Sequence, residues 1–311
     1  MIKKKSVPQP LVSVVITTKN EEANLPFCLE SLRHQDYPKR KMEVIVVDNN
    51  SADKTKAIAR RWGAQVVNIG PERSAQRNYG LKIARGKYAL FLDADMILSH
   101  TVISQAVTKA EKQSLAALYV PEIVLGTSFW SEVRRFERSF YDGTVVDAVR
   151  FLRRHIFLKT GGFDLSLTGP EDWDLDKKIR EEGAVAVLCR YDWERMNRRV
   201  KRIKRINLKS IRKLTFLSTK PVIYHNEANF NLMKYLQKKR YYSRSFERYI
   251  KKWGKNDPDI KRQFGLWYRY GTVFWEGGKW RRFLRHPFLV AGMYFLRVMV
   301  GIVFIISKKR K

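Results

Sequence analysis

Cysteine is scarce in this sequence, and no disulfide framework is available to it. Two cysteines, Cys28 and Cys189, stand far apart among 311 residues and lack the spacing of a metal-binding motif. This usage indicates a reducing compartment. The basic start, residues 1–5, has no apolar stretch behind it and does not match a secretory signal. Internal repeats and low-complexity linkers are also absent, which excludes repeat architectures.

Acidic residues are scarce in one part of the chain only. Residues 195–311 hold 32 basic and five acidic side chains, whereas the first 194 residues hold 30 basic and 25 acidic ones. Within residues 195–214, ten of twenty side chains are basic and none is acidic. Any one such run can be merely a solvated face. A chain this polarised is nevertheless expected to bind a polyanion or an anionic membrane surface.

A long hydrophobic run is missing until residues 288–306, which are almost all apolar. Spanning a bilayer takes about 20 apolar residues, so the length is marginal, and the central Arg297 is costly in lipid. Basic residues flank the run on both sides, at 281–285 and 308–311. They fit a helix lying in or dipping into the cytoplasmic leaflet at least as well as a full span. The alternative is a buried core helix. We expect association with the cytoplasmic face of the cell membrane, and the sequence does not decide whether the segment spans the membrane or lies in it.

Three apolar runs end in polar residues and alternate with helical patterns. They cover residues 11–16, 44–47 and 88–92. Alternating strands and helices predict an α/β fold with a mostly parallel, Rossmann-like sheet flanked by helices. Polar groups at the carboxyl ends of such strands line a ligand crevice. One rim is therefore expected to carry Asn20, Glu21, Asp48, Asn50, Asp93 and Asp95.

Asp93 and Asp95 are the most informative pair on that rim. They stand at positions i and i+2 directly after a buried strand. Oxygen ligands at such an edge suit a hard divalent cation that grips a diphosphate. The same triplet can also simply cap a turn.

Five motifs follow one another in a specific order between about residues 10 and 230. They are Val14–Glu21, Val46–Ser51, Arg77–Gly80, Asp93–Asp95 and Gly169–Asp172. Together they resemble the family 2 glycosyltransferases of the GT-A fold. The resemblance implies a catalytic domain over residues 1–230, and we expect a cationic helical region over 231–311 that contains the apolar segment 288–306.

The resemblance implies a nucleotide-sugar site at the first two strand ends. Asp48 matches the acid that accepts a hydrogen bond from the base, and both UDP- and GDP-sugars fit it. The first-strand loop around base and ribose is matched by Thr17, Asn20 and Glu21. Asn50 joins this set, although its segment also fits a turn before a helix. Further along the chain, the cations Arg73 and Arg77 could contact the diphosphate. For Arg73 the alternative is a position on a solvent-exposed helix face.

The resemblance also implies a metal, Mg²⁺ or Mn²⁺, bridging the phosphates. Asp95 matches the direct ligand, and Asp93 faces the ribose or a metal-bound water. His225, which follows the apolar run 221–223, resembles the family's late His ligand. A lone His is otherwise usually structural.

Glu171 and Asp172 resemble the family's Glu-Asp pair, in which the Asp takes the proton from the attacking hydroxyl. Direct displacement with one base predicts inversion at the anomeric carbon, in a metal-dependent hexosyltransferase. The alternative is that Asp172, Asp174 and Asp176 simply favour the first turn of a helix through its dipole.

Residues 237–241 read Gln-Lys-Lys-Arg-Tyr, where processive members of the family carry Gln-x-x-Arg-Trp. The sequence also lacks the several spanning helices of a channel. We therefore expect single addition to a lipid-linked or polysaccharide acceptor at the membrane.

A hypothesis of a different class is a basic nucleic-acid-binding protein, which the net charge of +32 would suit. It explains neither the ordered strand-end acids nor segment 288–306, so no nucleic-acid partner is expected.

Overall fold

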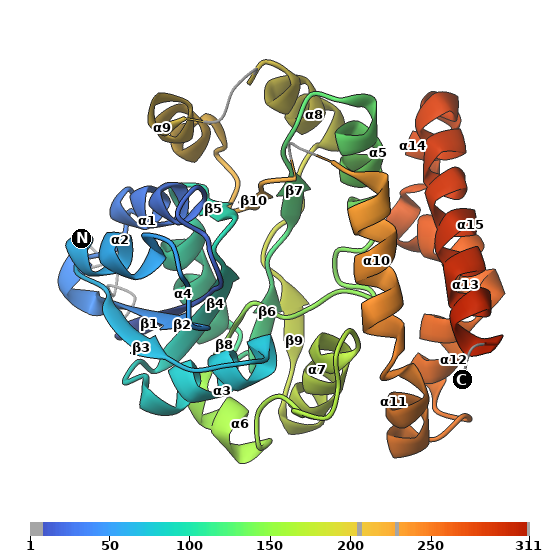
Figure 1. Ribbon diagram of the computed structural model, residues 1–311. Coiled ribbons are helices and arrows are strands. Elements are labelled where there is room, and N and C mark those ends of the chain that lie inside the picture. Colours follow the sequence, from blue (N-terminus) through green and yellow to red (C-terminus); the bar gives the residue numbers. More distant parts are fainter. Residues whose placement is uncertain (1–8, 204–206, 228–229, 310–311) are drawn as a thin grey trace, which may run out of the picture.

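The computed structural model describes residues 9–203, 207–227 and 230–309 (Figure 1). Its central sheet has seven strands in the order β3-β2-β1-β4-β8-β6-β9. Their bounds are β1 (Val12–Thr18), β2 (Met42–Asp48), β3 (Gln65–Asn68), β4 (Tyr88–Asp93), β6 (Ala117–Tyr119), β8 (Phe151–Arg153) and β9 (Val185–Val187).

The predicted mostly parallel arrangement is confirmed. Strands β3, β2, β1 and β4 run parallel to one another, β8 lies antiparallel between β4 and β6, and β9 is parallel to β6. The register aligns Thr18 with Asp48 and Thr17 with Asp93. The carboxyl ends of β1, β2 and β4 therefore meet at one edge of the sheet.

Helices cover both faces of the sheet, which explains why its central strands are apolar without alternation. On β1, Val14 packs in one core with Leu29 and Val107, while the adjacent Val15 packs in the other with Leu81 and Ile179. The helices around the sheet are α1 (Leu25–Arg33), α2 (Thr55–Arg61), α3 (Arg73–Ile83), α4 (Val102–Lys112), α6 (Arg154–Lys159) and α7 (Glu171–Glu182).

A small second sheet carries the late part of the chain back to the central one. It has the order β5-β10-β7, with β5 (Met96–Leu98), β7 (Glu122–Val124) and β10 (Ile223–His225). His225 at the end of β10 pairs with Met96 on one side and Val124 on the other. Because β5 directly follows the Asp93–Asp95 turn, this sheet brings residue 225 beside that turn.

The later helices gather on the side of the molecule away from β1, β2 and β3 (Figure 1). They are α10 (Leu232–Ser243), α11 (Phe246–Trp253), α12 (Pro258–Phe264), α13 (Leu266–Tyr270), α14 (Trp280–Arg285) and α15 (Pro287–Lys309), joined by short 3₁₀ turns. Three further helices complete the fold, α5 (Phe129–Arg138), α8 (Trp193–Lys201) and α9 (Leu208–Leu217). Helix α9 packs on α1 and β5, whereas α5 lies against α15. Phe136 of α5 shares one apolar core with Phe274 and Met293. The C-terminal helices thus pack onto α5.

Helix α15 has one buried and one exposed apolar side. Leu289, Met293 and Leu296 are buried against the rest of the protein, whereas Phe288 is 81% and Ile305 58% exposed. Residues Pro287–Ile306 are long and apolar enough to cross a membrane, by length and composition. The helix is therefore not the fully buried core helix that the sequence left open.

Arg297 does not lie on the exposed apolar side of α15. Its Nε lies 3.2 Å from Glu137 Oε1, it also donates to the Tyr141 hydroxyl, and its exposed fraction is 7%. The charge that looked costly in a membrane segment is thus neutralised inside the protein.

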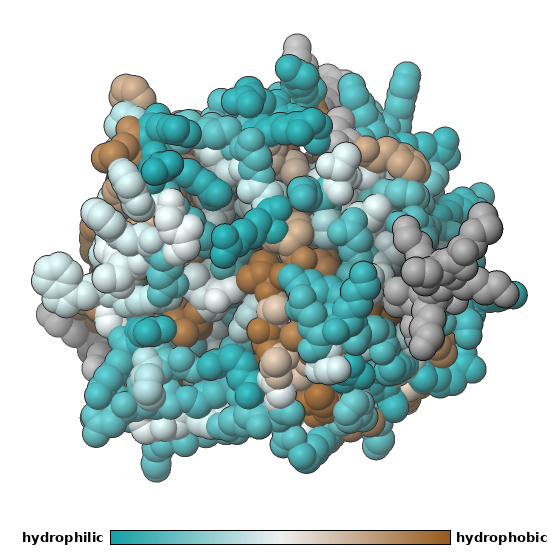
Figure 2. Space-filling model, turned by 180° about the vertical axis from the view of Figure 1, so that it is seen from behind, coloured by the Kyte–Doolittle hydropathy of each residue, from teal (hydrophilic) through white to brown (hydrophobic). Residues whose placement is uncertain are grey.

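The back of the molecule is mostly hydrophilic, with apolar side chains gathered in a patch near its middle (Figure 2). This surface agrees with a chain in which 30% of residues are charged.

Candidate active site

Asp48, at the end of β2, is fully buried and already bonded on both oxygens. Its Oδ1 accepts from the Ser51 backbone N–H at 2.7 Å, and Oδ2 accepts from the hydroxyls of Thr18 at 2.7 Å and Ser51 at 2.6 Å. Asp48 therefore ties the loop after β2 to the end of β1. Its contact with a nucleotide base stays a prediction.

The loops after β1 and β2 are held together by asparagines in left-handed backbone conformations. Asn20 has φ 53° and Asn50 φ 50°, a region that asparagine tolerates better than most residues. Asn20 Oδ1 accepts from the backbone N–H of Ala52 at 2.9 Å, and Asn50 N–H donates to Asn68 at 3.0 Å. Both are exposed on the rim where the donor was expected.

Glu21 lies beside this rim and is partly buried. Its backbone N–H donates to Thr55 Oγ1 at 2.8 Å, and its Oε2 accepts from Asn24 at 2.8 Å. Burial raises the pKa of Glu21, and the nearby carboxylates of Asp95 and Asp93 raise it further.

Asp93, the last residue of β4, is surrounded by cations. Its Oδ1 accepts from Arg77 Nη2 at 2.9 Å and from Thr17 Oγ1 at 3.2 Å, while Oδ2 lies 3.8 Å from Arg73 Nη1. Burial alone would raise the pKa of Asp93, but Arg77, Arg73 and Arg150 hold it well below its usual range. Asp93 is therefore ionised at neutral pH.

Arg77 connects the two acidic motifs. Its side chain is fully buried, with the guanidinium carbon 5.0 Å from the Phe91 ring centre and 5.2 Å from that of Phe163. One Nη donates to Asp93 and the other to Asp172, each at 2.9 Å. The sequence suggested a diphosphate contact for this cation. The structure gives it two carboxylate partners, a positioning task that sequence reasoning missed, and the diphosphate contact stays a prediction.

Glu171 and Asp172 begin α7 but have different surroundings. Glu171 is buried, accepts from the Gly169 backbone N–H, and pairs with Arg73 Nη2 at 2.7 Å. The side chain of Asp172 is 21% exposed, and Arg77 is the partner that holds its Oδ1. Asp172 is thus the more accessible member of the pair.

The later acids of α7 have structural partners of their own. Asp174 is fully buried and accepts from Trp253 Nε1 at 2.8 Å, and Asp176 accepts from the Tyr119 hydroxyl and from Arg180 at 2.9 Å. The helix-dipole alternative suits these residues, whereas Asp172 faces the site.

Asp95 and His225 meet across 130 positions of sequence. Asp95 Oδ2 lies 3.0 Å from His225 Nε2, and Asp95 Oδ1 is buried without a hydrogen-bond partner among the described residues. Burial lowers the pKa of His225, but the carboxylates of Asp95, Glu227 and Glu122 outweigh it and raise that pKa to about 9. Neither Glu122 nor Glu227 carried a recognisable sequence signal.

These two side chains fit a divalent cation. Within residues 9–203, 207–227 and 230–309, no three His, Cys, Asp or Glu side chains are grouped to hold a metal. An unbonded carboxylate oxygen beside an imidazole nitrogen suits an ion that takes its other ligands from phosphates and water, as Mg²⁺ does.

A cavity of about 180 Å³ adjoins Arg73 and Glu171 and is lined partly by α10. The Tyr241 hydroxyl donates to Glu72 at 2.6 Å, and the Arg73 guanidinium lies 5.8 Å from the Tyr242 ring centre. The Gln-x-x-Arg-Tyr segment therefore closes one side of the site.

Residues 13–163 match the sequence profile described as Glycosyl transferase family 2. This part of the chain belongs to that family. A 93-residue stretch is 43% identical to Glycosyltransferase AglE of Haloferax volcanii, covering 28% of this chain and 31% of that protein. Over 195 residues the chain is 29% identical to a PGL/p-HBAD biosynthesis glycosyltransferase of Mycobacterium bovis, covering 58% and 73%.

A third relative is the Beta-monoglucosyldiacylglycerol synthase of Trichormus variabilis, 24% identical over 226 residues, with 61% of this chain and 48% of that protein covered. The alignments with this synthase and with AglE therefore span less than half of those relatives.

Solved structures confirm the GT-A fold predicted for the family 2 glycosyltransferase. The mannosyltransferase PcManGT from Pyrobaculum calidifontis, in complex with GDP-Man and Mn²⁺, superposes with a TM-score of 0.54 at 19% identity, covering 94% of this chain and 75% of that one. S. aureus TarS 1-349 in complex with UDP-GlcNAc gives 0.51 at 17% identity, covering 93% and 81%.

Proposed function

We propose that this glycosyltransferase moves one sugar from a UDP- or GDP-sugar to a lipid-linked acceptor at the cytoplasmic face of the cell membrane, with inversion and with Mg²⁺ or Mn²⁺. The observation that carries the proposal is the buried Arg77, which holds Asp93 and Asp172 at 2.9 Å each. The same guanidinium thereby fixes the position of Asp172, the candidate base, relative to Asp93 on the donor side.

Asp95 and His225 would hold the metal, which when bound offsets charge on the departing nucleoside diphosphate. The unbonded Oδ1 of Asp95 supports this assignment. Around it, Thr17, Asn20, Glu21, Asp48 and Asn50 would surround the base and ribose, as the family resemblance implies. Mn²⁺ and GDP-Man in the Pyrobaculum mannosyltransferase support a nucleotide-sugar donor with a divalent cation.

Asp172 would act as the base, assisted in position by Arg77 and by the Arg73–Glu171 pair. The acceptor hydroxyl gives its proton to the carboxylate of Asp172. The oxygen of that acceptor hydroxyl bonds to the anomeric carbon of the sugar. The bond from the anomeric carbon to the phosphate oxygen breaks at the same time, and the nucleoside diphosphate leaves. A single displacement of this kind inverts the anomeric configuration.

Exposed apolar side chains support a membrane location. Twelve of the twenty large hydrophobic side chains that are exposed in the described residues fall within 266–306. Trp267 is 88% and Trp275 67% exposed, and Trp side chains favour the membrane–water interface. The name of the Trichormus synthase, which refers to a glycosylated diacylglycerol, supports a lipid acceptor.

Single addition is supported by Tyr241 in place of the processive Trp, and by α15 as the one apolar helix of membrane-spanning length within the described residues. The nucleic-acid-binding alternative is disfavoured by membership of a glycosyltransferase family.

The test is a panel of UDP- and GDP-sugars with Mg²⁺ or Mn²⁺, scored for nucleoside diphosphate release with and without polyprenyl phosphate or glycolipid. We expect one donor to be turned over, faster with a lipid acceptor, and NMR of the product to show an inverted anomeric centre. No release from any donor with either metal would overturn the proposal.

A further inference from the structure

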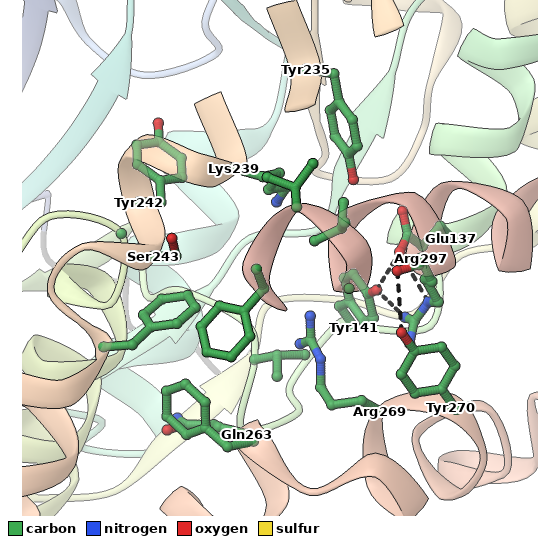
Figure 3. A pocket seen from close by; sticks show the side chains of 18 of the residues that line it. Glu137, Tyr141, Tyr235, Lys239, Tyr242, Ser243, Gln263, Arg269, Tyr270 and Arg297 are labelled. Carbon is green, nitrogen blue, oxygen red and sulfur yellow. Dashed lines mark hydrogen bonds and ion pairs between the residues drawn. The ribbon is translucent and has the colours of Figure 1, made fainter. Parts of the chain in front are cut away.

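A second, larger cavity lies between α5, α10, α13 and α15 (Figure 3), with a volume of about 360 Å³. It is separate from the Asp95–His225 pair, and the tasks described above do not use most of its lining. Its walls combine charged groups with aromatic and aliphatic side chains.

Most charges around this cavity are already neutralised. Glu137 Oε2 lies 2.7 Å from Arg134, its Oε1 lies 3.2 Å from Arg297, and Arg138 pairs with Glu122 at 3.0 Å. These contacts make two separate groups of ion pairs, and Figure 3 draws the contacts between Glu137, Tyr141 and Arg297.

Two cations in the cavity form no ion pair with a carboxylate within the described residues. Neither Lys239 nor Arg269 has a side-chain hydrogen bond or ion pair within the described part of the chain. The Lys239 ammonium lies 5.4 Å from the centre of the Tyr235 ring, and Glu137, the acid that acts on it, is already paired with Arg134 and Arg297. Figure 3 shows the two side chains entering the cavity from opposite sides. Partly buried cations without partners are costly, so an anion between them would be strongly favoured.

The remaining wall of the cavity is apolar and continues along α15. Val300 and Phe304 line it from α15, and Phe246 and Phe264 line it from α11 and α12. The outer side of the same helix is the exposed apolar surface described above. A ligand with an anionic head would therefore find an apolar path from the head towards the membrane-facing side.

The lining of the cavity includes residues adjacent in sequence to the Glu171–Asp172 pair, although neither of these two acids lines it. Gly169 and Trp173, on either side of the Glu171–Asp172 pair, belong to its lining. Tyr242 lines both this cavity and the smaller one beside Arg73. A ligand head in the cavity would thus lie next to the acceptor side of the site.

We infer that this cavity binds the phosphate or diphosphate group of the lipid-linked acceptor, with Lys239 and Arg269 as its phosphate-binding residues and α15 as the path of the lipid chain. The inference rests on the proposed function and names the acceptor as a phosphorylated lipid. Charge complementarity, the apolar wall and the Tyr242 side chain that this cavity shares with the smaller one beside Glu171 point to this occupant.

The experiment measures binding of farnesyl phosphate to the full chain in detergent micelles by calorimetry, with farnesol and inorganic phosphate as comparison ligands. Lys239→Met and Arg269→Gln should each weaken farnesyl phosphate binding by about 10-fold or more, the range of a lost charge-assisted hydrogen bond. The exposed residues Lys234 and Arg262 offer matched controls, Lys234→Met and Arg262→Gln, whose affinity should stay within twofold. Farnesol and inorganic phosphate should bind far more weakly.

Three results would overturn the inference. They are equal affinity for inorganic phosphate, which marks a simple anion site; equal competition by phosphatidylserine, which marks a membrane headgroup site; and unchanged affinity in both cavity variants. Donor hydrolysis by water, measured on the same samples, separates the two proposals. If donor hydrolysis persists while the affinity for farnesyl phosphate is the same in the cavity variants as in the unchanged protein, this inference alone fails. If no donor is hydrolysed or transferred by any sample, the proposed function fails.

Discussion

Arg77 and Asp172 are 95 positions apart in sequence and are joined by a 2.9 Å hydrogen bond. The same guanidinium donates to Asp93 and packs between two aromatic rings. The candidate base is therefore held by a residue of α3 whose own position depends on the central sheet. The geometry of the base and of the Asp-x-Asp turn cannot vary independently.

Replacing Arg77 with methionine should lower stability and activity together. Removing one partner of a buried ion pair typically costs 3–5 kcal/mol, and because Asp93 and Asp172 are about one-fifth exposed we expect a loss near the lower end, about 3 kcal/mol. Urea unfolding monitored by circular dichroism measures it. Arg73→Gln is the control, with a smaller loss because the Arg73 side chain is 30% exposed. An Arg77→Met protein of unchanged stability would contradict the positioning task.

Asp95→Ala should abolish metal-dependent turnover, because it removes the carboxylate whose oxygen is left unbonded. The measurement is nucleoside diphosphate release across a titration of Mg²⁺ and Mn²⁺. Asp36→Ala removes an exposed carboxylate outside the site and should leave turnover unchanged. Full activity of Asp95→Ala at every metal concentration would rule out the ligand assignment.

Asp172→Asn should lower kcat by at least about 10²-fold, the lower end of a general-base contribution. Donor binding should be largely retained, because the amide oxygen can still accept from Arg77. Single-turnover kinetics and nucleotide titration separate the two effects. Loss of nucleotide binding instead would move Asp172 to the donor side.

Substituting the exposed face of α15 should weaken membrane binding without removing the packed face. The variant Phe288→Ser, Val298→Ser, Ile305→Ser changes side chains that are 81%, 51% and 58% exposed. Each buried apolar side chain contributes about 1.5–3 kcal/mol, so partition into anionic liposomes at high salt should fall by at least about tenfold. The control, Leu165→Ser with Leu208→Ser, changes exposed leucines elsewhere. Equal sedimentation of both variants with liposomes would exclude the anchor.

Binding of a phosphorylated lipid at pH 8 should take up about one proton. Burial, with Arg134, Arg269 and Lys238 nearby, lowers the pKa of Lys239 to about 7, while Glu137 opposes this. Lys239 is therefore mostly neutral at pH 8 when the cavity is empty. A phosphate raises that pKa, so the amine gains a proton on binding, and affinity falls as pH rises above about 7.

Calorimetry of farnesyl phosphate binding in buffers of different ionisation enthalpy measures this proton uptake. Lys239→Met should remove it, whereas Lys234→Met should not. Uptake that survives Lys239→Met would assign the proton to another group.

The apolar runs and the polar residues that end them were predictable because strand formation and burial follow local pattern. Val14, Val46 and Leu90 lie in strands as expected, and Asp48, Asp93 and Asp95 lie at one edge of the sheet. Parallel pairing of neighbouring strands is enough to place them there.

Other features depended on contacts between distant segments, which no local pattern encodes. The Asp95–His225 pair depends on the pairing of β10 with β5. The charge of Arg297 is neutralised by Glu137 only because α15 packs on α5. The direction in which Arg77 points, and the lack of an ion pair at Lys239 and Arg269 within the described residues, follow from the same kind of long-range packing.

The sequence by itself thus determined the sheet, its family and the acidic rim, because periodicity and motif order are properties of adjacent residues. Only the tertiary structure decided which cations face carboxylates and which face an open cavity. Burial makes each unpaired charge costly, and the partner that offsets it comes from an element far away in the chain.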